Sequence, residues 1–120
     1  MPVPIPSDWR TAVVKVLQTS DPKRIEWTIP ARQRWETDTF GGAWVTDAYE
    51  GMIAALEDDS IEGNETTAFP GQIATYEFFF FRNRPQGGLE KMYGKIALKQ
   101  GRISILILSA HRPERQTLRP

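Results

Sequence analysis

The chain has 120 residues, of which 40% are hydrophobic and 25% charged, an ordinary composition for one globular domain with a single core. It contains no cysteine, so disulfide bonds, thiolate metal sites and cysteine nucleophiles are excluded. Its apolar runs are far shorter than a membrane span, and residues 1–9 lack the features of a secretion signal. We expect one cytoplasmic domain over 1–120 without membrane contact, with flexible segments at 1–6 and 116–120.

The net charge of zero hides a strong segregation of charge along the chain. Residues 1–35 contain six basic and three acidic residues, and residues 36–81 contain ten acidic residues and no lysine or arginine. Residues 82–120 contain nine basic and two acidic residues. Such segregation favours one surface that attracts polyanions and another that meets a basic partner. The alternative is that the three segments interleave in space and neutralise one another.

The first half of the chain predicts helices separated by one strand. A helix over 8–19 follows from a serine and an aspartate at its start and from apolar residues spaced along one stripe. The alternation of apolar and polar residues at 23–29 predicts a half-buried strand. Proline can open a short helix over 30–35, and Gly41–Gly42 marks a turn. A second amphipathic helix is expected over 47–57.

The second half predicts an exposed acidic loop at 57–71, followed by strands near 73–81, 92–99 and 102–110. The last strand is apolar on both faces and should therefore be central in its sheet, and Gly101 suits the tight turn before it. Helices followed by a run of strands predict an α+β fold, a mainly antiparallel sheet with two amphipathic helices packed on it. The expected core residues include Val13, Leu17, Ile25, Trp27, Ile53, Leu56, Ile105 and Ile107.

The only histidine, His111, lies where the apolar strand meets an arginine-rich tail. Ser109 and His111 are two residues apart, which places them on one face of the strand. Arg112, Arg115 and Arg119 follow. Metal-free RNA cleavage needs a general acid or base, a role that histidine fills, and cations that stabilise the phosphorane. His111, Arg112 and Arg115 are therefore candidate catalytic residues, and the alternative is an ordinary surface histidine.

The preceding strand adds a row of lysines. We place Lys91, Lys95 and Lys99 on one of its faces, and Tyr93 and Ala97 on the other. Lys95 is a fourth candidate for stabilising the transition state, while the remaining basic residues would bind phosphates. Lysines at alternate strand positions also protect sheet edges from pairing, which is the structural alternative. The candidate RNA-binding residues are Arg82, Arg84, Lys91, Tyr93, Lys99 and Ser109.

The segment MYGKIALKQGRISILILSAHRPER resembles the closing strands of small bacterial ribonuclease toxins of the RelE, barnase and colicin-nuclease type. In those toxins a Tyr-x-Lys-hydrophobic strand precedes an apolar strand that ends near Ser-x-His or Arg. The matching positions here are Tyr93, Lys95, Ile96, Ser109 and His111. The resemblance covers the C-terminal third of the chain. It implies a metal-independent endoribonuclease without a cofactor, with RNA as substrate and an antitoxin or immunity protein as possible partner.

Other interpretations stay open. A non-catalytic binding module, such as an adaptor, antitoxin or immunity-like protein, would use the acidic surface of 47–65 against a basic partner. A small-molecule site would use an aromatic pocket around Trp27, Tyr76 and Phe79. Three acids lie close enough in sequence to chelate Mg²⁺ or Ca²⁺, but acids in a loop are usually solvated and we predict no metal site. These acids are Asp58, Asp59 and Glu62.

Overall fold

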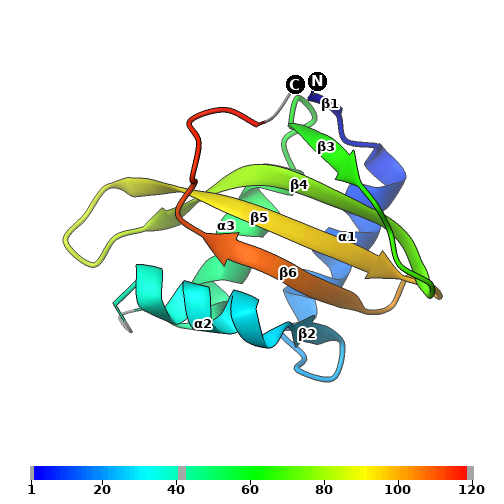
Figure 1. The fold of residues 1–120 in the computed structure, drawn as a ribbon, viewed down its shortest axis with the longest axis horizontal. Helices are drawn as coiled ribbons and strands as arrows, with labels where there is room; N and C mark the ends of the chain where they lie inside the picture. Colours follow the sequence, from blue (N-terminus) through cyan, green and yellow to red (C-terminus); the bar gives the residue numbers. More distant parts are fainter. Residues whose placement is uncertain (1, 41–42, 119–120) are drawn as a thin grey trace.

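The structure, a computed structural model, describes residues 2–40 and 43–118. Its elements are β1 (Val3–Pro4), α1 (Ser7–Thr19), β2 (Ile25–Trp27), α2 (Ile29–Asp38), α3 (Val45–Leu56), β3 (Glu62–Thr66), β4 (Gln72–Asn83), β5 (Leu89–Lys99) and β6 (Ile105–His111). They form the predicted α+β fold, a mostly antiparallel six-stranded sheet with three helices (Figure 1). The predicted turn at Gly41–Gly42 and the candidate Arg119 lie outside the described residues.

The strands lie side by side in the order β1-β3-β4-β5-β6-β2. Neighbouring strands are antiparallel except β2, which runs parallel to β6. The prediction that the last three strands are consecutive antiparallel neighbours is confirmed. The apolar strand β6, expected to be central, pairs with β5 on one side and with the short edge strand β2 on the other, but only at Ile105–Ile107. Gly101 before it has a φ of 89°.

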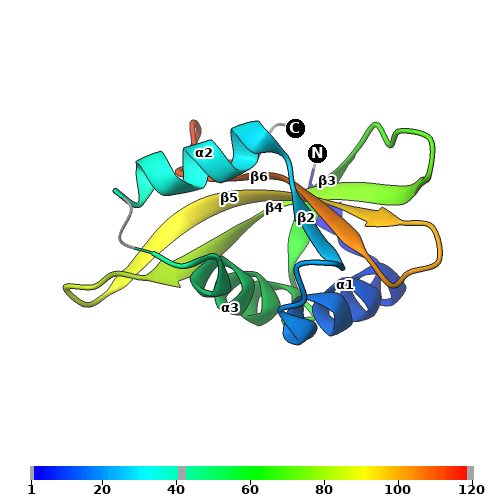
Figure 2. The ribbon, with the colours of Figure 1, turned by 90° about the horizontal axis from the view of Figure 1, so that it is seen from below.

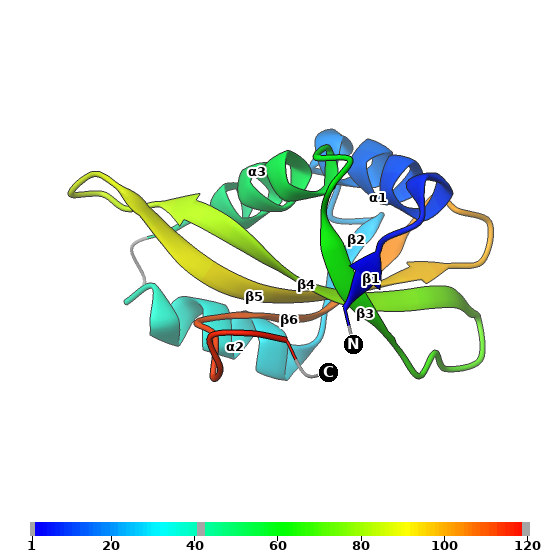
Figure 3. The same cartoon turned by 90° about the horizontal axis from the view of Figure 1, so that it is seen from above.

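The helices lie on both sides of the sheet. Helices α1 and α3 cover one face together, as Figures 2 and 3 show from opposite directions. Helix α2 lies on the other side, along β6, together with the chain that follows β6. Thr28 caps α2 by accepting a hydrogen bond from Ala31 N at 3.2 Å, and Pro30 occupies its first turn, where no backbone N–H is needed. This early start ends the strand predicted at 23–29 after Trp27.

The core lies between the sheet and the pair α1 and α3. Trp35 reaches it from α2 and stacks on Phe80, with ring centroids 6.5 Å apart. Of the eight expected core residues, Trp27 and Ile53 are only partly buried at the periphery of the core. The other six are buried, as expected: Val13, Leu17, Ile25, Leu56, Ile105 and Ile107.

Two segments differ from the expected loops. Residues 62–66, expected to lie in an acidic loop, form β3, which pairs with both β1 and β4. Val3–Pro4, in the segment expected to be flexible, form β1, and Ile5 beside it is buried. The polar sequence of β3 has no apolar alternation to mark it as a strand, because its pairing depends on its neighbours in the sheet. Among the described residues, none of the helices is long and apolar enough to cross a membrane.

Candidate active site on the open sheet face

The face of β4, β5 and β6 that is turned away from α1 and α3 carries most of the polar chemistry, and we call it the open face. Antiparallel register places side chains of neighbouring strands directly opposite one another, within contact distance. Two cross-strand rows result. One row consists of Glu77, Lys95 and Ser109, and the next of Phe79, Tyr93 and His111.

A β-bulge turns His111 toward this face. Lys95 pairs with Ser109, but the next residue, Ile96, pairs with Ile107, so β6 has one extra residue between them. Ile107 points into the core, and simple alternation would send His111 there too. The extra residue reverses the alternation, so that Ala110 is buried and His111 lies on the open face. The sequence prediction that Ser109 and His111 share a face is correct, and the bulge determines which face it is.

The position expected for Tyr93 was wrong. Tyr93 is two residues from both Lys91 and Lys95, and strand alternation therefore gives the three side chains the same face. The ring of Tyr93 packs edge-on against Phe79, with centroids 6.4 Å apart. On its other side it lies against the ring of His111, at 5.1 Å. Tyr93 thus stands at the centre of the open face.

Glu77 is the carboxylate that the sheet contributes to the site, and it was not among the residues predicted from the sequence. The Tyr93 hydroxyl donates a hydrogen bond to Glu77 Oε2, and Asn64 Nδ2 donates to Oε1 at 3.1 Å. These two donors, from β5 and β3, fix the carboxylate between them. One signal could have found it, because Glu77 is the only charged residue in the otherwise apolar and aromatic run from Ala74 to Phe81.

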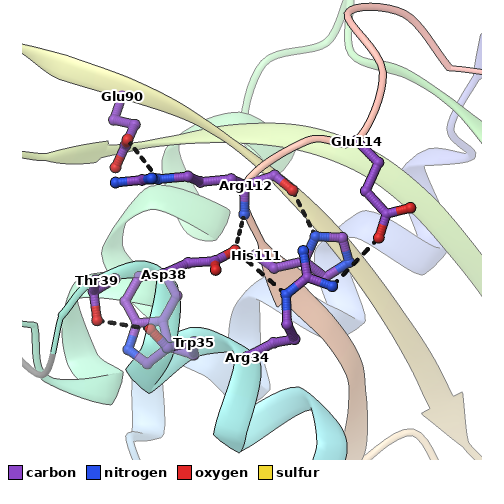
Figure 4. A network of polar contacts seen from close by, with 8 residues as sticks. All are labelled: Arg34, Trp35, Asp38, Thr39, Glu90, His111, Arg112 and Glu114. Atoms are coloured by element: carbon purple, nitrogen blue, oxygen red, sulfur yellow. Dashed lines mark hydrogen bonds and ion pairs between the residues drawn. The ribbon is translucent and has the colours of Figure 1, made fainter.

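The ring of His111 is held by the backbone of the next residue, Arg112. Its Nδ1 lies 2.6 Å from the carbonyl oxygen of Arg112, a contact in which the nitrogen must be the donor (Figure 4). The proton of the neutral ring is therefore assigned to Nδ1. Nε2 is then an acceptor in the neutral ring and a donor in the protonated ring, as a proton-transferring group requires.

These side chains line a pocket of about 350 Å³ between the sheet and the C-terminal segment, residues 112–118. This volume lies within the range of small-ligand sites. Arg115 is the cation in its lining, and it has no ion pair within the described residues. Thr66 also lines the pocket, and its Oγ1 is buried without a hydrogen-bond partner there. The remaining lining residues are Glu77, Phe79, Tyr93, His111, Pro113, Glu114, Thr117 and Leu118.

The C-terminal segment is tied to the domain along its length. Asp38 Oδ2 accepts a hydrogen bond from Arg112 N at 2.8 Å, and Arg34 Nη1 lies 3.3 Å from Glu114 (Figure 4). Lys91 Nζ donates to the carbonyl oxygen of Gln116 at 2.7 Å. These bonds anchor part of the tail that was expected to be flexible. They also make Lys91 a support for the pocket wall.

Two of the candidate arginines belong to a structural cluster. Arg82 is only 6% exposed, and its Nη2 lies 2.8 Å from Glu90 Oε1. Arg112 Nε lies 3.2 Å from the other oxygen of Glu90, and its guanidinium stacks on Phe40 at 5.2 Å. Arg82 occupies an even-numbered position of β4, which faces the core, and it therefore has no surface for phosphate. Arg82 is therefore not one of the RNA-binding residues.

Other candidates lie away from the pocket. Lys99 forms an ion pair with Glu26 at 2.9 Å near the far end of β5, and Arg84 lies in the hairpin at the other end. The expected single basic surface is therefore divided, and part of its charge is neutralised by acids of other segments. The residues that do come together on or over the open face are Lys91, Tyr93, Lys95, Ser109, His111 and Arg115.

The aromatic small-molecule pocket does not form. Trp27 Nε1 donates to the Tyr49 hydroxyl at 2.8 Å, and Tyr76 packs against Trp9 with centroids 4.9 Å apart. Phe79 lies on the opposite face of the sheet. The expected trio is therefore dispersed.

Two of the three acids considered as metal ligands, Asp58 and Asp59, have other partners. Asp58 accepts hydrogen bonds from Ser60 N at 2.9 Å and Ser60 Oγ at 2.7 Å, which lower the pKa of Asp58. Asp59 lies 3.4 Å from Arg10. No group of three histidine, cysteine, aspartate or glutamate residues suited to a metal occurs in the part of the chain that the structure describes.

Comparisons of the chain with protein-family models, with curated proteins and with solved structures find no match. Fold and site together define an α+β protein with a carboxylate, an imidazole and a guanidinium around one pocket on an antiparallel sheet.

Proposed function

We propose that the protein is a metal-independent endoribonuclease whose active site is the open-face pocket. The observation that carries the proposal is that Glu77 and His111 line one pocket from two different strands, with Tyr93 between them. A carboxylate and an imidazole are the general base and general acid that cleavage of RNA through its own 2′-hydroxyl requires. Arg115 in the same lining supplies positive charge for the phosphate.

The roles follow from the chemistry of each group. Glu77 takes the proton of the 2′-hydroxyl, and the resulting oxygen attacks the adjacent phosphorus. The bond from phosphorus to the 5′-oxygen breaks, and that oxygen receives the proton of His111 Nε2. The products are a 2′,3′-cyclic phosphate and a free 5′-hydroxyl. Arg115 and Lys95 stabilise the charge on the phosphorane, and Phe79 and Tyr93 offer aromatic surface for a base.

We place this activity in the cytoplasm, where RNA is available, and we propose that the protein is a toxin controlled by an antitoxin or immunity protein. Binding of RNA would be supported by Lys95 and Arg115, whereas the guanidinium of Arg112 is bound to Glu90 and is left out of this role. Because these cations displace counterions from phosphates, affinity for RNA should fall as salt rises.

The test is cleavage of a mixed RNA in EDTA by the purified protein. Glu77→Gln and His111→Ala should each lose about 10²–10⁴-fold in rate, the usual contribution of a general acid or base. Arg115→Ala and Lys95→Ala should lose about 10²–10³-fold, if each supplies one stabilising contact. Arg84→Ala is the matched control, because it removes an arginine outside the pocket.

Equal cleavage by wild type and His111→Ala would remove His111 from the mechanism. If no protein cleaves RNA at high concentration, the ribonuclease proposal is wrong and a non-catalytic binding module replaces it.

A further inference from the structure

A second groove, of about 380 Å³, lies between α3 and the outer edge of β4 and shares only Phe79 with the lining of the acid–base pocket. Its lining is mainly apolar, and two of its large side chains are well exposed, Phe81 at 49% and Leu89 at 61%. Ala54, Ala55 and Ile61 add to the apolar surface. Exposed apolar side chains gathered around one groove are typical of a surface that a partner covers.

The edge of β4 at this groove has unpaired strand backbone. β3 pairs only with Thr75–Glu77, and farther along, up to Asn83, β4 has no second strand neighbour in the described chain. Helix α3 packs directly against this edge at Phe81, where a Cβ on Gly51 would lie 2.2 Å from the carbonyl oxygen, so the helix covers that oxygen. The helix therefore forms one wall of the groove and the strand edge forms the other. Edge strands of this kind accept extended segments of other chains.

The polar part of the lining is acidic. Asp47, Glu50 and Asp58 come from α3 and the turn after it. The basic residue in the lining, Arg82, is almost fully buried and bound to Glu90. The charge that a partner meets at this groove is therefore negative.

We infer that this groove binds an extended segment of a second protein, in which lysine or arginine alternates with apolar residues. Alternation suits the site, because successive side chains of an extended segment point in opposite directions. One set would contact Phe81 and Leu89, and the other would face Glu50 and its acidic neighbours. Nucleic acid is repelled by the same acids, and a second copy of this chain would bring two acidic grooves together. The inference does not depend on whether the open face cleaves RNA.

The probe is a library of short random peptides, selected for binding to the immobilised full chain at low salt. Selected peptides are then synthesised, and their affinities are measured by fluorescence polarisation. Glu50→Lys reverses one exposed charge of the groove, and Ala54→Arg fills the groove from an exposed helix position. Glu36→Lys makes the same charge change on α2, outside the groove, and is the matched control.

Selection should enrich peptides in which basic and apolar residues alternate. Because like charges at an interface oppose binding, Glu50→Lys and Ala54→Arg should each weaken binding by about 100-fold, while Glu36→Lys should bind like wild type. Peptide binding should also slow hydrogen exchange at the amides of 79–83. RNA cleavage by both groove variants should equal that of wild type.

Four outcomes would overturn the inference. The first is enrichment of acidic peptides or of none, and the second is unchanged affinity in both groove variants. The third is RNA that competes with the selected peptides, which would assign the groove to nucleic acid. The fourth is self-association in sedimentation that Ala54→Arg abolishes, which would make a second copy the occupant.

Discussion

The hydroxyl group of Tyr93, on β5, donates a hydrogen bond to the carboxylate of Glu77 on the neighbouring strand β4. If Glu77 is the general base, Tyr93→Phe removes one of the two donors that position it and leaves the aromatic ring in place. A hydrogen bond to a charged group contributes about 1.5–3 kcal/mol, so the rate should fall by about 10- to 100-fold. The loss should appear in kcat, and steady-state kinetics with KM unchanged would check it. A loss confined to KM would instead make Tyr93 a substrate-binding residue.

Glu90 holds two arginines, of which Arg82 is buried, and this predicts a large structural effect. Glu90→Gln should lower the free energy of unfolding by about 3 kcal/mol or more, because it leaves the Arg82 charge buried without its counterion. Urea denaturation measures the change. Arg84→Ala, on the exposed hairpin two residues away, should change stability by no more than about 0.5 kcal/mol. If both variants lose a similar amount of unfolding free energy, the ion pair between Arg82 and Glu90 does not stabilise the fold.

Tyr49 predicts a pH-dependent contribution to stability. Burial raises the pKa of its hydroxyl, against smaller opposing effects of the Trp27 hydrogen bond and of Arg32. The unfolded chain releases this proton at about pH 10, whereas the folded chain retains it. The contribution of Tyr49 to the free energy of unfolding is therefore fully present below about pH 10. It is lost as pH rises through the pKa that Tyr49 has in the folded state.

Tyr49→Phe should make this alkaline loss of stability shallower. At neutral pH it should cost about 0.5–1.5 kcal/mol, because Trp27 Nε1 loses its acceptor. Thermal unfolding across pH measures both effects. If Tyr49→Phe loses stability at alkaline pH as steeply as wild type, the loss does not come from ionisation of Tyr49. Tyr76, whose pKa burial also raises, accounts for the part of the limb that should persist.

Replacing Gly51 with alanine has two opposite effects on the stability of the protein. Alanine in the interior of a helix is favoured over glycine by about 1 kcal/mol. The added Cβ, however, would lie 2.2 Å from the backbone oxygen of Phe81 and 2.9 Å from the Phe80 ring, and a backbone atom cannot move aside cheaply. Gly51→Ala should therefore destabilise the protein by about 1–3 kcal/mol in urea denaturation. A stabilised variant would mean that α3 can shift away from β4.

Several features of the fold could be predicted from the sequence because they depend on periodicity within one element. Apolar spacing predicted α1 and α3, alternation predicted β2, and Gly101 predicted a turn before β6. The cap expected from the serine and aspartate at the start of α1 was wrong, because Pro6 occupies that position without a side-chain hydrogen bond. The two apolar faces of β6 predicted a neighbour on each side, and β2 provides the second one at Ile105–Ile107 only. The pairing of β1 with β3 could not be predicted, since neither segment carries a strand pattern of its own.

The candidate site depended on relations between strands. The segment around His111 was recognisable in sequence, but the bulge opposite Lys95 decides that His111 faces the pocket and not the core. The pairing of β4 with β5 brings Glu77 to Tyr93, and the inward face of β4 removes Arg82 from the surface. The spacing of apolar residues within one helix or strand determines which of its faces is apolar, and this spacing can be read from the sequence. The register between elements, which decides which faces meet, comes from packing of the whole sheet, and only the tertiary structure contains it.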